Sequence, residues 1–308
     1  MKHRIATLLP SATEIACALG LADRLVGISH ECDYPPEIRH LPALTRAKID
    51  PRGRSVEIDA QVRDLVRDGL SVYTVLEDEL RAAAPDLIVT QDQCEVCAVS
   101  LAEVQECARR ILGADVEVLS LSPNTLDDIL ADFTRFAEVV GCEDAGRALV
   151  ADARRRLDAI AGGARRARTA PRVACIEWIE PLMVAGNWVP ELVRLCGGIY
   201  EHAEPGEHSK TLDWQALTDF APDVVLIMPC GFDLAQTRRE LPALRENPAW
   251  AALPAVRNRR VYSVDGNAYL NRPGPRIIDS AEIVAGIVQP DLFASSIPAG
   301  SYERVESA

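Results

Sequence analysis

The chain has 308 residues, a length that exceeds the usual size of one compact core and predicts two lobes or domains. Hydrophobic residues make up 48% of it and charged residues 26%, a composition that excludes a mostly disordered chain. The formal net charge of −13 repels phosphate backbones, so we expect no nucleic-acid partner. No stretch approaches the ~20 apolar residues that cross a bilayer, so we expect no membrane span.

The first residues partly resemble a secretory signal, with a basic start and an apolar patch. Pro10, Thr13 and Glu14 interrupt that patch, which therefore lacks the apolar core of roughly 7–15 residues that a signal peptide needs. We interpret the segment as a strand over Ile5–Leu9 followed by a helix with Ser11 as its N-cap. The chain as written is predicted to stay in the cytoplasm, and to be periplasmic only if its start is misassigned. Nine cysteines, an odd number, also fit a reducing compartment.

Two segments far apart in the chain resemble each other: LRAAAPDLIVTQDQC and LTDFAPDVVLIMPCG. Each predicts a helix that ends at Ala-Pro-Asp, then a buried strand (Leu87–Thr90 or Val224–Met228), then a loop with a cysteine. Short apolar runs that alternate with helices are typical of parallel strands covered on both faces. Each half of the chain is therefore predicted to be a small α/β domain, and the repeat suggests that the two are related.

A long helical stretch, roughly residues 125–166, separates the two halves. Gly141 is predicted to divide it, which leaves a second helix of about 22 residues that begins at Glu143 and could bridge two lobes as a stiff rod. The predicted organisation is an N-terminal lobe over residues 1–123, a linker with the bridging helix over 124–170, and a C-terminal lobe over 171–308. The tail after about residue 294 is expected to be flexible.

Two further stretches carry a family resemblance: the opening LLPSATEIACALGLADRLVGISHECDYP and the closing LPAVRNRRVYSVDGNAYLNRPGPRIIDSAEIVAGIV. Over residues 3–293 the chain resembles the substrate-binding proteins of ABC importers for vitamin B12 and iron chelates, and its opening is most similar to the cobalamin-binding branch. The resemblance implies two Rossmann-like lobes with parallel sheets joined by one long helix. It also implies a non-enzymatic protein that binds cobalamin or a related corrinoid or metal chelate between the lobes, with an ABC permease as partner. We expect a monomer.

Ligands of open α/β sheets bind at the carboxyl ends of the strands, and this rule selects the candidate ligand residues. Tryptophan faces suit a flat macrocycle, an asparagine could pair with its amides, and an arginine could reach a carboxylate. Capping of a helix is an equally good interpretation of the serine. The candidates are Ser11, Asp33, Tyr34, Gln91, Gln93, Trp178, Asn187, Trp188, Phe232, Tyr269 and Arg276.

Four residues are candidate metal ligands: His30, Cys94, Cys97 and Cys230. The CxxC pair could be half a zinc site, a redox dithiol, soft ligands for a cofactor metal, or simply buried small side chains. An alternative function is therefore a cytoplasmic metal-trafficking or thiol redox protein that holds zinc or iron at these residues. No G-x-S-x-G, P-loop, H-E-x-x-H or G-x-G-x-x-G motif occurs, so no enzymatic activity is expected beyond a minor redox role of the cysteine pair.

Overall fold

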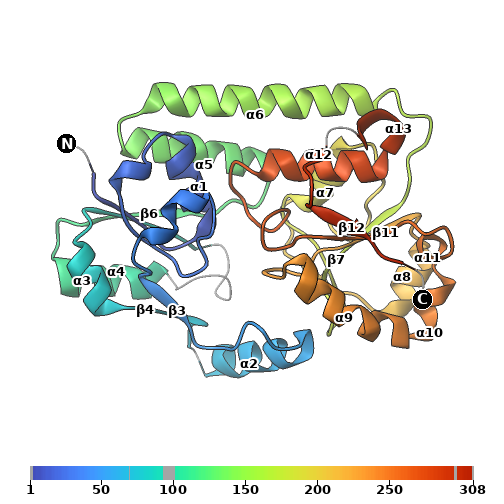
Figure 1. Ribbon diagram of the computed structural model, residues 1–308, viewed down its shortest axis with the longest axis horizontal. Coiled ribbons are helices and arrows are strands. Elements are labelled where there is room, and N and C mark those ends of the chain that lie inside the picture. Colours follow the sequence, from blue (N-terminus) through green and yellow to red (C-terminus); the bar gives the residue numbers. More distant parts are fainter. Residues whose placement is uncertain (1–2, 69, 93–100, 295–296, 307–308) are drawn as a thin grey trace. The chain divides into compact units, whose positions relative to one another are not determined.

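The computed structural model describes residues 3–68, 70–92, 101–294 and 297–306. The chain forms two compact units, and each is built from strands and helices in alternation (Figure 1). Unit 1 comprises Met1–Pro51, Ala60–Pro123 and Asp127–Asp152, and unit 2 comprises Arg52–Asp59, Asn124–Leu126 and Ala153–Ala308. The predicted α/β fold class is confirmed.

Unit 1 contains a four-stranded sheet with the order β2-β1-β5-β6, and every pair in it is parallel. Its strands are β1 (Ile5–Thr7), β2 (Leu25–Ile28), β5 (Leu87–Gln91) and β6 (Glu117–Leu121). The central strands β1 and β5 are buried along their whole length, as the continuous apolar runs predict. A separate antiparallel ribbon pairs β3 (Thr45–Ala47) with β4 (Tyr73–Val75).

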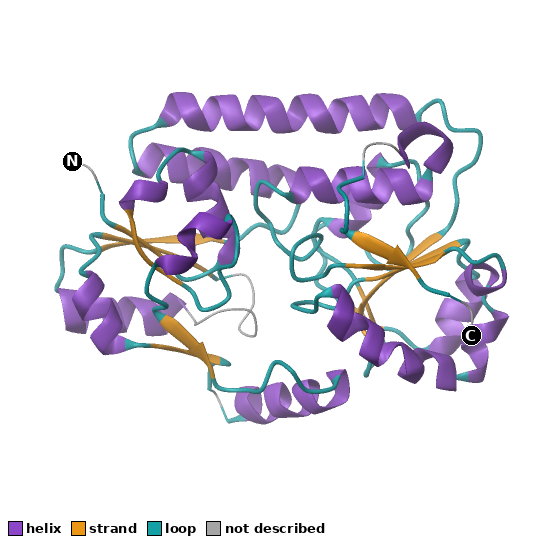
Figure 2. Ribbon diagram, in the orientation of Figure 1, coloured by secondary structure: helices purple, strands orange, loops and turns teal. Residues whose placement is uncertain are grey.

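Helices cover both faces of this sheet (Figure 2). The core between the sheet and one helical layer contains Ala6, Ile88, Leu80, Val104 and Ala108. The helices of unit 1 are α1 (Pro10–Ala18), η1 (Ala22–Arg24), η2 (Pro36–His40), α3 (Glu77–Ala83), α4 (Leu101–Leu112) and most of α5 (Leu126–Val139).

The repeated Ala-Pro-Asp sequence forms the same joint in each unit. Ala84 and Ala221 end a helix in the left-handed conformation, with φ of 43° and 49°. In unit 1, the Asp86 side chain accepts the Arg4 backbone N–H at 2.9 Å. In unit 2, the Asp223 side chain accepts the Arg172 backbone N–H at the same distance. The aspartate therefore ties the first strand of each unit to the strand that follows the joint, which explains the repeat.

Unit 2 contains a six-stranded sheet with the order β12-β11-β10-β7-β8-β9. β11, β10 and β7 are parallel and form its centre, while the other three strands pair antiparallel at the two edges. The strands are β7 (Val173–Trp178), β8 (Met183–Val184), β9 (Lys210–Thr211), β10 (Val224–Ile227), β11 (Val261–Val264) and β12 (Tyr302–Arg304). The tail after residue 294, which is expected to be flexible, contains β12, and its backbone pairs with β11 at one edge of the sheet.

The helices of unit 2 lie on both faces of its sheet (Figure 2). They are α7 (Val189–Leu195), α8 (Trp214–Phe220), α9 (Leu234–Glu246), α10 (Pro248–Ala252), α11 (Pro254–Arg257), α12 (Ile277–Val288) and α13 (Pro290–Phe293). Trp250 packs edge-on against Trp214 in one of these layers, with ring centroids 6.4 Å apart.

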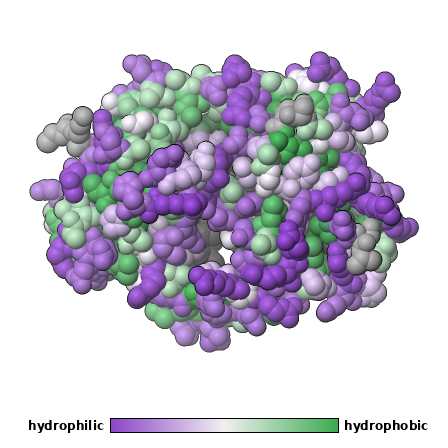
Figure 3. Space-filling model, viewed as in Figure 1, coloured by the Kyte–Doolittle hydropathy of each residue, from purple (hydrophilic) through white to green (hydrophobic). Residues whose placement is uncertain are grey.

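Two helices of the middle segment follow the prediction closely. Gly141, with φ of 69°, ends α5, and α6 then runs over Glu143–Ala164, or 22 residues. Ile129, Phe133 and Phe136, which recur on α5 at helical spacing, are fully buried. α6 begins in unit 1 and ends in unit 2. The 13-residue helix α2 (Ser55–Arg67) begins in unit 2 and ends in unit 1. Hydrophilic residues predominate on the face of the molecule in Figure 3, as the charge count leads one to expect.

Candidate functional site

The strand ends of unit 2 hold several of the predicted ligand residues. β7, β10 and β11 end at Trp178, Ile227 and Val264, and the loops after the last two contain Phe232 and Tyr269. We call these three strand ends and the loops that follow them the unit 2 edge. Because ligands of α/β sheets bind beyond the carboxyl ends of parallel strands, this edge is the candidate site within unit 2.

Trp178 presents an aromatic surface at the unit 2 edge. Its ring centroid lies 5.2 Å from that of Phe232, and the two planes meet at 59°. The indole Nε1 donates to the Glu180 carbonyl at 3.1 Å. Phe232 is buried while Trp178 is only half-buried, so Phe232 supports the indole and Trp178 keeps accessible surface. The structure thus brings two predicted residues together and gives them different roles.

Trp188, the other predicted tryptophan, lies in the core of unit 2. It is buried, and its Nε1 donates to the Leu270 carbonyl at 2.6 Å. Asn187 beside it has a left-handed φ of 51°, a conformation that asparagine tolerates better than most residues. The Oδ1 of Asn187 is buried and has no hydrogen-bond partner in the described part of the chain. An unpaired buried acceptor is costly, so a donor on a ligand would stabilise it.

Arg276 and Tyr269 meet where α12 begins. The guanidinium carbon lies 5.6 Å from the centroid of the tyrosine ring, a cation–π distance. Arg272, which the sequence analysis does not select, is as deeply buried as Arg276, and its Nη2 donates to Asn267 Oδ1 at 2.9 Å. The sequence RPGPR offers both arginines equally, and only the fold shows that both guanidinium groups are enclosed.

A second group of residues, beside the end of β7, is missed by sequence reasoning. Glu177, near the end of β7, accepts the Ser209 hydroxyl, and Ser209 Oγ accepts the Gly186 N–H at 3.0 Å. Gly186 has to be glycine, because a Cβ there would lie 2.2 Å from the Glu207 carbonyl oxygen. The signal lies in the run CIEWIEP, where an acidic residue directly precedes the predicted tryptophan.

Asp265 orders the loop that follows β11. Its Oδ1 accepts the backbone N–H groups of Asn267 and Ala268 at 3.0 and 2.8 Å. Burial raises the pKa of this carboxyl, although the two backbone hydrogen bonds act in the opposite direction. Asp265 therefore shapes the loop that carries Tyr269.

In unit 1, the carboxyl ends of the strands hold Ser11 and Gln91, both of them buried. Ser11 is not the N-cap of α1, as the sequence suggested. Leu9 takes that position in an extended conformation and Pro10 is the first helical residue. Proline has no N–H to satisfy and a φ that suits the first turn, so it starts the helix and moves the serine into that turn. β1 accordingly ends at Thr7, two residues earlier than predicted.

His30 follows β2 and belongs to a small polar group of unit 1. Its Nδ1 lies 2.8 Å from Thr45 Oγ1, and its ring centroid lies 5.3 Å from that of Tyr73. The Tyr73 hydroxyl donates to Glu31 Oε1 at 2.8 Å. Burial lowers the pKa of His30, so the ring is neutral at pH 7, the form in which imidazole binds metals. One of its nitrogens is already engaged by threonine.

The remaining predicted residues are scattered. Asp33 is half-buried and Tyr34 is 43% exposed, both in the loop after β2. Cys230 is exposed at the unit 2 edge, and its N–H donates to the Glu177 carbonyl at 3.2 Å. Gln93, Cys94 and Cys97 lie outside the described residues. In the described part of the chain, no group of three or more His, Cys, Asp or Glu side chains is placed to hold a metal ion.

A sequence model of a family described as periplasmic binding protein matches residues 5–268. The Vitamin B12-binding protein of Vibrio cholerae is 24% identical over 286 residues, which cover 92% of this chain and 87% of that protein. An uncharacterized ABC transporter substrate-binding lipoprotein of Bacillus subtilis is 22% identical over 296 residues, covering 94% and 81%. The crystal structure of a periplasmic heme binding protein from Pseudomonas aeruginosa matches with a TM-score of 0.70 at 20% identity, covering 94% of this chain and 93% of that one.

These matches overturn the predicted location. The cytoplasmic location is wrong, because the matching family and the Pseudomonas aeruginosa protein are named as periplasmic and the Bacillus subtilis protein is named as a lipoprotein. That prediction rested on the interrupted apolar patch of the first residues and on the odd number of cysteines, and both are weaker evidence than a match along most of the chain. Separately, none of the helices that the structure describes is both long and apolar enough to cross a membrane.

Proposed function

Because the chain belongs to the periplasmic binding protein family, we propose that it captures cobalamin, or a closely related corrinoid, for delivery to an ABC permease. The observation that carries the proposal is the similarity to Vitamin B12-binding proteins along about nine-tenths of this chain. The matched proteins are binding proteins, and the proposal is accordingly a non-enzymatic one.

The aromatic surface of Trp178 supports a flat ligand. A tryptophan side chain can bury roughly 150–250 Å² against a partner, and Phe232 holds this one in place. A planar macrocycle would cover the accessible part of the indole. Both a corrin and a heme have this shape, so the aromatic surface selects the class of ligand rather than one member.

The Asn187 side chain, beside the buried Trp188, favours a corrinoid within that class. Asn187 offers a buried oxygen that has no donor in the described part of the chain. Cobalamin carries peripheral amides, which have N–H groups to donate, whereas the ionised carboxylates of heme can only accept. A cobalamin amide would therefore satisfy Asn187 and a heme carboxylate would not.

Binding is tested by gel filtration of the purified protein with hydroxocobalamin and, in parallel, with hemin. We expect the cobalamin to elute with the protein, and we expect Trp178→Ala to raise its dissociation constant roughly ten-fold, which corresponds to about 1.4 kcal/mol. Arg239→Ala, an exposed residue of α9, serves as the control and should bind as the wild type does. Retention of hemin alone would overturn the corrinoid proposal, and retention of neither would overturn the whole class.

The metal-trafficking and thiol redox alternative receives no support from the described residues. His30 and Cys230 lie in different units and neither belongs to a group of metal-binding side chains there. Elemental analysis of the purified protein for zinc and iron separates the two functions, since the cobalamin proposal requires neither metal. A permease partner is part of the proposal, and the monomeric state stays a prediction.

A further inference from the structure

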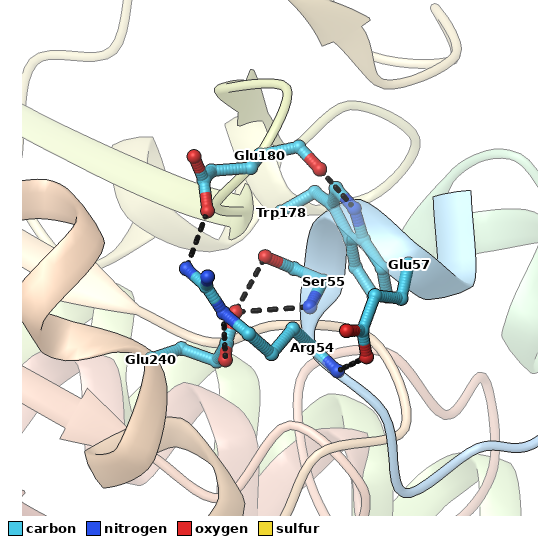
Figure 4. A network of polar contacts seen from close by, with 6 residues as sticks. All are labelled: Arg54, Ser55, Glu57, Trp178, Glu180 and Glu240. Carbon is cyan, nitrogen blue, oxygen red and sulfur yellow. Dashed lines mark hydrogen bonds and ion pairs between the residues drawn. The ribbon is translucent and has the colours of Figure 1, made fainter. Parts of the chain in front are cut away.

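The start of α2 is hydrogen-bonded to a buried carboxylate of unit 2 (Figure 4). Glu240, on α9, is only 4% exposed. Its Oε2 accepts the backbone N–H of Ser55 at 2.9 Å and the Ser55 hydroxyl at 2.6 Å. Ser55 and Glu240 both belong to unit 2, although 185 residues separate them in the chain.

This contact replaces an ordinary helix cap. Arg54 precedes the first helical residue, and its side chain has no acceptor with which to cap the helix. Glu57 reaches back to the Arg54 N–H at 3.0 Å, which is one half of a capping box. The carboxylate of Glu240 accepts the N–H of Ser55, the first helical residue, and is well placed for the positive end of the helix dipole. Residues 54 and 55 are therefore held in one position.

With its backbone held, the Arg54 side chain joins two segments of unit 2. Its Nε lies 3.7 Å from Glu240 Oε1, and its Nη2 donates to Glu180 Oε2 at 3.0 Å. Glu180 is the residue whose carbonyl accepts the Trp178 Nε1 hydrogen bond. Three direct contacts thus connect the buried carboxylate of Glu240 to the Trp178 indole, by way of Arg54 and Glu180, and Figure 4 shows each of them.

We infer that Arg54 is a positioning residue for Trp178, acting through Glu180. The inference rests on the proposed function only for its consequence, that the indole so held contacts the ligand. The guanidinium has the geometry for this role because it can face two carboxylates at once, which the single ammonium of lysine does less well. The Arg54–Glu180 pair is itself largely exposed, so its contribution should weaken as salt is added.

The first experiment uses no ligand and reads the environment of Trp178. The emission of Trp178 is obtained as the difference between each protein and the same protein carrying Trp178→Phe, which removes the signals of the other tryptophans. For Arg54→Ala we expect acrylamide quenching of this difference signal to rise about two-fold with a red shift, and for Arg54→Lys a partial change. Arg239→Ala, the control on α9, should leave it unaltered. Circular dichroism verifies that each variant is folded.

The second experiment measures hydroxocobalamin and hemin binding to the same variants. Arg54→Ala should raise the dissociation constant of whichever chelate binds by about three- to ten-fold. Because salt screens exposed charges, the dissociation constant of the wild type in roughly 0.5 M salt should approach that of the variant. An unchanged Trp178 signal in folded Arg54→Ala would overturn the inference. A changed Trp178 signal with unchanged chelate binding would uphold the positioning and overturn the contact between Trp178 and the ligand.

Discussion

Asp132 offers a sharp test of the electrostatics of unit 1. Its side chain on α5 is 5% exposed, and it pairs with Arg135 at 2.9 Å through Oδ1. Its Oδ2 is buried and has no hydrogen-bond partner in the part of the chain that is described. Burial outweighs the attraction of Arg135 and raises the pKa of this carboxyl from 3.8 to about 6. The folded protein therefore resists the ionisation of Asp132.

The sign and size of the effect follow from the two pKa values. Below about pH 4 the carboxyl is protonated in the folded and the unfolded chain, and its charge costs nothing. As the pH rises from about 4 to 6, the unfolded chain ionises first, so the folded state loses stability, and the loss persists at higher pH. A rise from 3.8 to about 6 corresponds to roughly 3 kcal/mol. Because the Arg135 end of the pair is solvated, we discount this to about 1–2 kcal/mol.

Asp132→Asn isolates this contribution, because the amide oxygen still accepts from Arg135 while the titration is removed. Urea unfolding of both proteins at pH 4 and pH 7 gives the difference in the free energy of unfolding at each pH. From pH 4 to pH 7, we expect the free energy of unfolding of the variant to rise by about 1–2 kcal/mol relative to that of the wild type. Every other titrating group is common to both proteins and cancels. A difference that stays constant across this range would refute the reasoning.

Three further outcomes are expected. Ala221→Gly should raise the free energy of unfolding by about 0.5–1 kcal/mol, because glycine adopts the left-handed conformation without strain. Ala216→Gly, in the exposed part of α8, should lower the free energy of unfolding by about as much. Burial lowers the pKa of His202 from 6.5 to about 4. As the pH drops through this range, only the unfolded chain takes up a proton, so the stability of the folded protein should fall. His202→Phe should reduce this dependence on pH in acid unfolding curves. Cys230 is exposed and should react with a thiol reagent in the native protein, whereas Cys175 and Cys196 are buried with raised pKa values and should react only on unfolding, as peptide mapping would show.

Much of the fold can be predicted from the sequence because local signals agree with the tertiary structure. The Ala-Pro-Asp joints, the break at Gly141 and the length of α6 all depend on residues close together in the chain. The unit 2 sheet departs from an all-parallel prediction at its edges, where β8, β9 and β12 are two or three residues long. Strands so short carry no readable alternation, so their pairing depends on partners elsewhere in the chain.

The candidate site is predicted less well, for a different reason. The carboxyl-end rule selects loops, yet it cannot tell which side chain in a loop faces outward. Trp178 and Trp188 are equivalent by that rule, but the Leu270 carbonyl draws the second indole into the core and leaves the first half-buried. Phe232 likewise lies beneath Trp178 rather than at an open surface. Burial of an aromatic residue is decided by contacts that the sequence does not display.

The least predictable residues are glutamates that act at a distance. Glu240 accepts the first N–H of α2 across 185 residues, and Glu191 accepts the first N–H of α5 across 65 residues at 2.7 Å. In the sequence each is an ordinary charged position on a helix of unit 2, where a solvated role is the usual one. Each instead accepts a backbone N–H at the start of another helix, and Glu191 does so from the first turn of α7. α2 and α5 both begin in unit 2 and continue in unit 1, so each of these two glutamates lies in the unit in which its helix begins.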